Sequence, residues 1–189
     1  IPQVLMQKGN DLLKTDPAAA AAVYQQILDS DATNGVAALR LGAAYNAAGK
    51  AEEAVKAFEI AAANGQEATA KKQLSNVYLK QASNFLKAKK YSDAVEAALK
   101  CNEYVANPTA LQIAGQASQL GGKNNDAIKY FSEYLEAAPT AKNAGQIAYT
   151  VGALYQQAGN NAKAKEFYQK AMSDPKYGAE AKKLFDALK

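Results

Sequence analysis

The chain has 189 residues, of which 49% are hydrophobic, and this length suffices to bury a substantial core within a single domain, 1–189. The formal net charge is +4, and Arg40 is the only arginine among 22 basic residues. Arginine supplies the planar fork that reads bases and grips phosphates, so nucleic acid is disfavoured as a partner. Histidine is absent and Cys101 is the only cysteine, which argues against metal sites, internal disulfides and histidine catalysis. We therefore expect neither a cofactor nor enzymatic activity.

The ends and apolar segments of the chain bear on its compartment. No apolar run approaches the roughly 20 residues that a membrane-spanning helix needs, so we expect no membrane insertion. The sequence starts at Ile1 rather than at methionine. The localisation therefore stays open: we expect a cytoplasmic protein, or a periplasmic one if a leader preceded Ile1.

A pattern of glycine and alanine recurs along the chain. The stretch LGAAYNAAGKAEEA (41–54) has a glycine, a second glycine seven positions later and an alanine five positions after that. The same layout appears in AGQASQLGGKNNDA (114–127) and VGALYQQAGNNAKA (151–164). When the pattern is extended along the whole chain, its alanine recurs five times. The positions are Ala20, Ala54, Ala94, Ala127 and Ala164, and the spacings between them are 34, 40, 33 and 37 residues. A period in the thirties is typical of a helical solenoid.

Taken in chain order, the units are expected at about 1–34, 35–68, 69–107, 108–141 and 142–176, each with two helices. The first unit has a turn shortened by one residue, with Pro17 in the first turn of its second helix. The third has six extra residues, TAKKQL (69–74), and we expect them to lengthen its first helix. Residues 177–189 have one apolar face and one charged face, as expected of a helix that caps an open stack.

Small and large side chains alternate between the two helices of each unit. The small residue of the first helix is expected at Gly9, Gly42, Ala82, Gly115 and Gly152, and a bulky one three positions later at Leu12, Tyr45, Phe85, Ser118 and Tyr155, where only Ser118 breaks the pattern. The second helix carries Tyr24, Phe58, Ala98, Phe131 and Tyr168 four residues after its alanine. A small side chain lets two helices approach, and an aromatic ring fills the space beside them. Gly49, Gly122 and Gly159 are expected in the left-handed conformation that ends a helix.

This pattern resembles the tetratricopeptide repeat family over nearly all of the chain. The family's unit of about 34 residues is a pair of antiparallel helices with a small residue and an aromatic at matching positions. The resemblance implies an all-α fold, a right-handed α-solenoid of about five helical hairpins followed by a capping helix. The departures are Ala98, where an aromatic is missing, and Ser118.

Three other sequence features have simpler interpretations than a functional site. GGKNN (121–125) has Ala117 and Asn124 where a phosphate-binding loop needs glycine and a hydroxyl. DSDATNG (29–35) has Arg40 where a calcium loop needs a bidentate glutamate. Cys101 falls at a packing position, which predicts a buried hydrophobic side chain.

The family resemblance implies a non-enzymatic scaffold that binds a peptide or protein segment in a concave groove lined by the first helices. The clamp by which some members hold chaperone tails is incomplete here. Asn10 matches, whereas Met6 stands in place of a lysine, Arg40 in place of an asparagine, and Lys72 is paired with Asn76 in place of an arginine. A different acidic tail could still use Lys72 and Arg40. Projection of the first helices onto the inner face predicts groove residues Asn10, Lys14, Asn46, Asn76, Ser83, Lys87, Gln112, Gln116, Gln119, Gln146, Tyr149 and Gln156. Amides both donate and accept hydrogen bonds, which suits a peptide backbone, although glutamine is also simply a good helix former.

Self-association is the alternative function. An open stack has two ends, so a homodimer is possible, with Tyr104 and Tyr130 as candidate surface aromatics. A role in envelope assembly is a further alternative that depends on a leader before Ile1.

Overall fold

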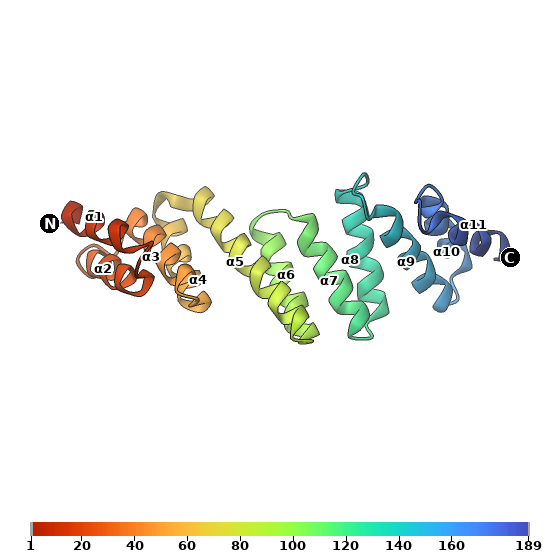
Figure 1. The fold of residues 1–189 in the computed structure, drawn as a ribbon, viewed down its shortest axis with the longest axis horizontal. Coiled ribbons are helices and arrows are strands. Elements are labelled where there is room, and N and C mark those ends of the chain that lie inside the picture. Colours follow the sequence, from red (N-terminus) through yellow and green to blue (C-terminus); the bar gives the residue numbers. More distant parts are fainter. Residues whose placement is uncertain (1, 189) are drawn as a thin grey trace. The chain divides into compact units, whose positions relative to one another are not determined.

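The structure is a computed structural model that describes residues 2–188, so the expectations tied to Ile1 and Lys189 lie outside the described residues. Within residues 2–188, helices form five consecutive hairpins and one final helix, and no strand is present. The hairpins are α1 (Pro2–Leu12) with α2 (Pro17–Ser30), α3 (Gly35–Ala47) with α4 (Ala51–Ala61), α5 (Glu67–Lys87) with α6 (Tyr91–Tyr104), α7 (Pro108–Leu120) with α8 (Asn124–Ala137), and α9 (Ala144–Gln157) with α10 (Asn161–Ala171) (Figure 1). The final helix is α11 (Gly178–Ala187). The expected all-α fold of helical hairpins with a capping helix is confirmed.

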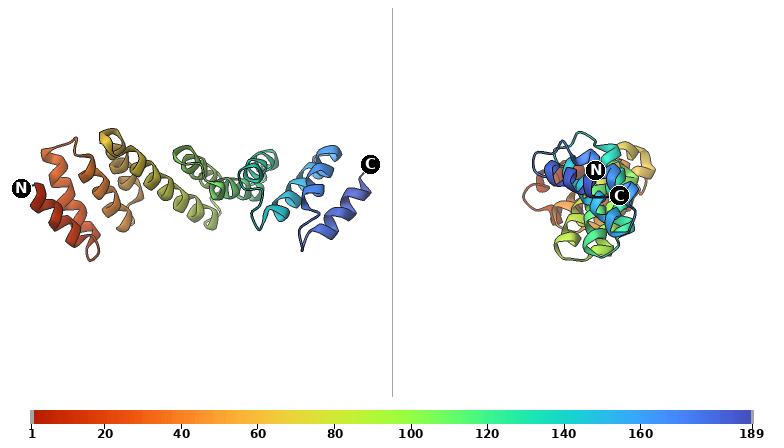
Figure 2. Two further views of the ribbon diagram at one scale, coloured as in Figure 1. Left: turned by 90° about the horizontal axis from the view of Figure 1, so that it is seen from above. Right: turned by 90° about the vertical axis from the view of Figure 1, so that its right-hand side faces the viewer.

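The chain divides into two compact units. Unit 1 runs up to Tyr78 and includes Glu103–Val105, and unit 2 comprises Leu79–Asn102 and the chain from Ala106 onward. Helices α1 to α4 therefore belong to unit 1 and α7 to α11 to unit 2. Within each unit, successive helices lie side by side and reverse direction at every turn (Figure 2).

Helix ends follow from local sequence. The side chains of Asp16, Asn34, Asn107 and Asn160 each accept a hydrogen bond from a backbone N–H in the first turn of the helix that follows. Gly49, Gly122 and Gly159 each have φ of 77°, as the pattern predicted, whereas the corresponding residue between α5 and α6 is Lys89, with φ of 59°. Asn64 and Gly65 interrupt the helix between α4 and α5, in the short turn η1 (Ala62–Gln66).

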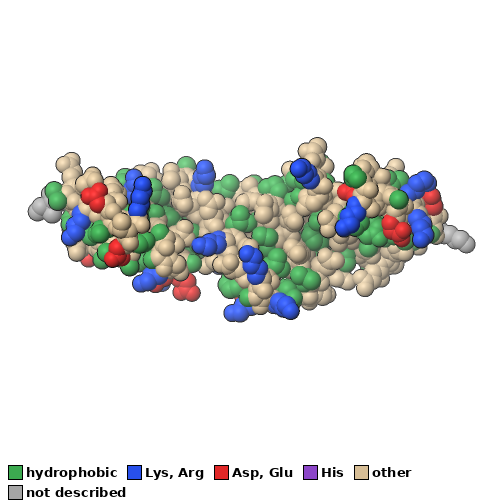
Figure 3. Space-filling view, viewed as in Figure 1, with side chains coloured by type: hydrophobic (Ala, Val, Ile, Leu, Met, Phe, Trp, Pro, Cys, Tyr) green, Lys and Arg blue, Asp and Glu red, His purple; other side chains and the backbone are tan. Residues whose placement is uncertain are grey.

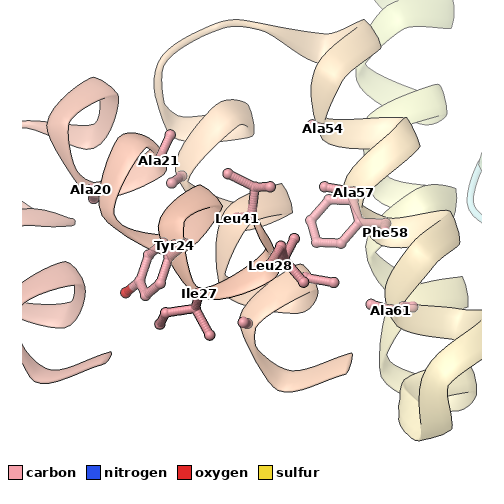
Figure 4. Close-up of a cluster of buried hydrophobic side chains, with 14 of the residues drawn as sticks. Ala20, Ala21, Tyr24, Ile27, Leu28, Leu41, Ala54, Ala57, Phe58 and Ala61 are labelled. Carbon is pink, nitrogen blue, oxygen red and sulfur yellow. The ribbon is translucent and has the colours of Figure 1, made fainter. Parts of the chain in front are cut away.

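The pairing of small and aromatic residues holds in four of the five hairpins. A Cβ added to Gly9, Gly42, Gly115 or Gly152 would lie within 2.7 Å of a ring carbon of Tyr24, Phe58, Phe131 or Tyr168, respectively. The second-helix alanines Ala20, Ala54, Ala94, Ala127 and Ala164 are completely buried. Figure 4 shows the Tyr24 and Phe58 rings among the buried side chains of unit 1. Only glycine leaves room for these rings beside the first helix.

The α5–α6 hairpin departs from the other four. Helix α5 has 21 residues, which confirms that the extra segment 69–74 lengthens it. Ala70 and Leu74, from this segment, are buried in the core of unit 1. The positions that elsewhere hold glycine and an aromatic are Ala82 and Ala98, both buried.

Helix α11 covers the last hairpin with its apolar face. Ala181 is completely buried, and Leu184, Phe185 and Leu188 pack against a cluster that includes Tyr168. The opposite face is exposed, and on it Lys182 Nζ lies 2.7 Å from an Asp186 carboxylate oxygen. The expected amphipathic capping helix is therefore present.

Candidate interaction site

The residues predicted to line a groove divide between the two units. Unit 1 holds Asn10, Lys14, Asn46 and Asn76, and unit 2 holds Ser83, Lys87, Gln112, Gln116, Gln119, Gln146, Tyr149 and Gln156. The exposed members are Lys14, Asn76, Lys87, Gln116, Gln119 and Gln146, and the others are half-buried. Lys14 lies in the turn after α1 rather than on the helix, because α1 ends at Leu12.

Two of these amides have a structural role. The Tyr24 hydroxyl donates to Asn10 Oδ1 at 2.8 Å, and the Tyr168 hydroxyl donates to Gln156 Oε1 at 2.6 Å. Both tyrosines are buried, and burial raises the pKa of each phenol above its ordinary value. A buried hydroxyl needs a partner, so Asn10 and Gln156 stabilise the packing of their own hairpins.

Tyr149 also has structural contacts. Its ring centroid lies 5.7 Å from that of Tyr168 and 5.3 Å from that of Tyr177, the residue just before α11. These distances are typical of aromatic pairs that stabilise packing. Tyr149 thus helps to hold the capping helix on the last hairpin.

The three glutamines of α7 differ from these residues. Gln112, Gln116 and Gln119 follow one another at helical spacing, and the last two are exposed. Within residues 2–188, their side-chain amides have no hydrogen-bond partner. Helices α7 and α9 contain no charged residue, whereas the second helices α8 and α10 of the same hairpins contain several. The exposed side of α7 therefore offers donors and acceptors without formal charge.

Two hollows in unit 2 were not predicted. The first has a volume of about 630 Å³ and lies among the ends of α8 and α10 and the start of α9. Its walls include Leu135, Pro139, Ala148, Phe167, Lys170 and Asp174. Asp174 already accepts backbone hydrogen bonds from Lys176 and Tyr177, so its carboxylate serves the turn before α11. Proline at 139 marked the loop in the sequence, but no residue pattern indicated a hollow.

The second hollow lies beside the turns of the α5–α6 and α7–α8 hairpins. Its volume is about 360 Å³, and Ser118 is among its lining residues. The sequence contained a signal for it, since Ser118 stands where the other hairpins have a bulky side chain.

The tyrosines proposed for a dimer surface are not free. Tyr130 is buried, because it packs in the core of its own unit. Tyr104 is half-buried, and its ring stacks on Tyr78 with centroids 5.9 Å apart. The expectation that these two side chains are surface aromatics outside the packing positions was therefore wrong.

The single cysteine and the acidic residues bear on other kinds of site. Cys101 is buried, as its packing position predicted. In residues 2–188, no group of three or more histidine, cysteine, aspartate or glutamate residues could hold a metal ion. None of the helices described there is both long enough and apolar enough to span a bilayer.

Comparison with known proteins shows similarity at the level of the fold. No family model matches the chain, and no curated protein matches it. A crystal structure of MamA is 18% identical, with a TM-score of 0.53, over 95% of this chain and 94% of that one. A structure of MamA AMB-1 is 24% identical, with a TM-score of 0.52, over 90% of this chain and 89% of that one. At these identities the similarity supports the arrangement of helical hairpins alone.

Proposed function

We propose that this chain is a tetratricopeptide-repeat scaffold without catalytic activity, and that its first helices bind an extended segment of a partner protein. The observation that carries the proposal is the uncharged outer side of α7, where Gln112, Gln116 and Gln119 form a row of amides. The helical-hairpin fold that the chain shares with the MamA structures is compatible with such a surface but does not identify a partner.

The chemistry of this row suits a peptide backbone. An extended segment has N–H and C=O groups that need both acceptors and donors, and each glutamine amide supplies both. The absence of charge on α7 and α9 disfavours a partner that binds through a carboxylate at this place. An uncharged polar stretch of the partner is the better match for α7.

The other predicted groove residues divide into contact residues and residues that hold the helices in place. Within unit 2, Gln146 on α9 and Ser83 and Lys87 on α5 are proposed as additional contact residues. Asn46 and Asn76 are proposed separately as contact residues of unit 1. Asn10, Tyr149 and Gln156 are proposed to contribute mainly by holding the helices in place, given their contacts with tyrosines.

Panning a library of random peptides on the immobilised chain tests the proposal. Affinities of the selected peptides would be measured by fluorescence polarisation for the wild type and for Gln112→Ala/Gln116→Ala/Gln119→Ala. Alanine is a better helix former than glutamine, so the fold should be retained. We expect affinity to fall at least about tenfold, equivalent to about 1.4 kcal/mol.

The matched control is Gln26→Ala/Gln169→Ala, which removes exposed glutamines from the second helices α2 and α10. It should leave affinity unchanged. Equal affinity of the triple variant and the wild type for every selected peptide would refute binding at α7.

Self-association remains the second candidate, and the distribution of charge favours it. Unit 1 has seven basic and nine acidic residues, and unit 2 has fifteen basic and nine acidic residues. Opposite net charges, −2 and +6, allow one copy to attract another. Light scattering at several protein concentrations should then give a molar mass that rises with concentration and falls with added salt. A monomer mass throughout would exclude this candidate.

A further inference from the structure

The first helices of unit 2 contain no aspartate or glutamate. These helices are α7, α9 and the part of α5 that belongs to this unit, Leu79 to Lys87. The acidic residues that the hairpin helices of unit 2 do contain all lie on the second helices: Asp93, Glu96, Asp126, Glu133, Glu136 and Glu166. The two sides of these hairpins therefore differ in charge.

Lys80 and Lys87 are the basic residues of these first helices, and both are exposed. They are seven residues apart, which places them on one side of α5 about 10 Å from each other along the helix axis. Figure 3 shows several lysine or arginine side chains, and no aspartate or glutamate, on the face where Figure 1 places this part of α5 and the turn after it.

The charges of Lys80 and Lys87 are not neutralised within the protein. Neither lysine has an ion-pair partner among residues 2–188. On the second helix α10, by contrast, Lys163 and Lys170 both lie within 3.2 Å of a carboxylate oxygen of Glu166. A carboxylate that approaches α5 from outside therefore meets two lysines without displacing one of the chain's own acidic groups.

Helix stability explains only one of the two lysines. Lys87 lies in the last turn of α5, where a positive charge interacts favourably with the helix dipole. Lys80 lies well before the last turn, so it lacks this benefit. Neither position accounts for the lack of acidic residues on all three first helices.

From this charge distribution we infer that the partner segment carries acidic residues over Lys80 and Lys87 of α5, next to the uncharged polar stretch that α7 binds. The inference rests on the proposed scaffold function and specifies the chemistry of the partner. A uniformly charged polyanion matches less well, because α7 and α9 offer it no cation. The bound segment thus has a charged part and an uncharged part.

The test pans the library of random peptides on the full chain and on Lys80→Gln/Lys87→Gln. We expect peptides selected on the wild type to be enriched in aspartate and glutamate toward one end, relative to the unselected library. The enrichment should be lost on the double variant. On Lys80→Glu/Lys87→Glu the selected peptides should instead be enriched in lysine and arginine.

Fluorescence polarisation with the acidic peptides measures each contact. Removing one lysine should weaken binding about two- to fivefold, the range expected for exposed ion pairs. Lys80→Gln alone should show this loss without a change in the urea unfolding midpoint, which separates binding from the helix-end role of Lys87. Added salt should weaken binding to the wild type more than binding to Lys80→Gln/Lys87→Gln.

The matched control is Lys129→Gln/Lys142→Gln, which removes the same charge from α8 and from the loop before α9. Lys129 and Lys142 are exposed, and their loss should leave affinity unchanged. An equal loss in this control would assign the preference to the net charge of the unit and overturn the inference.

The library also separates this inference from the scaffold function. Selected peptides that depend on Gln112, Gln116 and Gln119 but show no acidic enrichment would refute only the contact with α5. If no peptide is selected on the wild type, the scaffold function is refuted together with the inference.

Discussion

The α5–α6 hairpin and the other four hairpins show two ways of packing a pair of helices. In the four, a ring lies directly against a glycine of the first helix, as Phe58 does against Gly42. In α5–α6, the same two positions hold Ala82 and Ala98, both buried. The difference teaches that glycine is needed on the first helix where the second helix presents a ring, and that alanine suffices where it does not.

The turns of these hairpins differ in the same way. Three of the four end their first helix with a left-handed glycine, and α5–α6 uses Lys89 instead. Glycine adopts this conformation without a Cβ penalty, whereas lysine does not. The α5–α6 hairpin therefore lacks the contact between a ring and a first-helix glycine, and it also has a less favourable turn.

The largest effect is expected from removing a ring. Phe58→Ala should lower the free energy of unfolding by about 3–5 kcal/mol, because truncating a buried aromatic leaves a cavity. Urea unfolding followed by circular dichroism measures it. The half-exposed Phe85 provides the control, and Phe85→Ala should have a clearly smaller effect. An equal loss for the two variants would contradict the role assigned to the Gly42–Phe58 contact.

A double-mutant cycle tests whether glycine is needed at position 42 only when the Phe58 ring is present. Gly42→Ala alone should cost about 1–3 kcal/mol, because the new Cβ would overlap Phe58. In the Phe58→Ala background the same change should be neutral or stabilising, since alanine is then the better helix former. The pair of changes reproduces Ala82 and Ala98 of the α5–α6 hairpin. Additive effects in the unfolding cycle would show that the two positions are independent.

The reverse exchange at Ala82 should have a smaller effect. Ala82→Gly is expected to destabilise by about 1 kcal/mol, because glycine is unfavourable inside a helix and Ala98 presents no ring that needs the space. Urea unfolding measures this change as well. A stabilising effect would mean that α5 and α6 are held apart by the Ala82 methyl group.

A substitution in the α5–α6 turn should change the free energy of unfolding by about as much as Ala82→Gly, but in the opposite direction. Lys89→Gly should stabilise the chain by about 1 kcal/mol, by relieving the left-handed lysine. Gly159→Ala should destabilise it by about 1 kcal/mol, because it introduces a side chain at the same conformation. Unfolding midpoints in urea measure both. If Lys89→Gly is destabilising, the Lys89 side chain makes a contact that outweighs its backbone conformation.

The smallest effect concerns alkaline pH. Burial raises the folded-state pKa of Tyr24 and Tyr168 above the ordinary value of 10.0. The unfolded chain then releases these protons first, so unfolding should become easier as the pH rises above about 10 and be unaffected by them at lower pH. Tyr24→Phe/Tyr168→Phe should flatten this decline in urea midpoints between pH 8 and 11. The α5–α6 hairpin adds nothing from this position, because Ala98 cannot ionise. If the urea midpoints of the variant fall as steeply as those of the wild type, ionisable groups other than Tyr24 and Tyr168 cause the decline.

Much of the fold could be predicted because the repeat leaves local signals. Glycine at 49, 122 and 159 marks the ends of first helices, and Pro17 marks the start of α2. The uninterrupted segment 69–74 predicted a longer α5. These signals act within a few residues along the chain, so sequence alone suffices to interpret them.

The candidate site was less predictable. Helical projection placed Asn10, Gln116 and Gln156 in one class, although Asn10 and Gln156 bind tyrosine hydroxyls and Gln116 is exposed without a partner. Tyr130 was expected at the surface, but it is buried. Spacing along a helix gives the direction of a side chain, but it does not reveal which neighbour from another helix meets it.

The sequence by itself therefore determined the helical hairpins, their order and most of their turns, because backbone preferences and short-range spacing decide these features. Only the tertiary structure decided which amides are free, which tyrosines are buried and where the hollow beside Ser118 lies. Those features depend on atoms from helices that are distant in sequence, and their packing in three dimensions is what creates or fills the space.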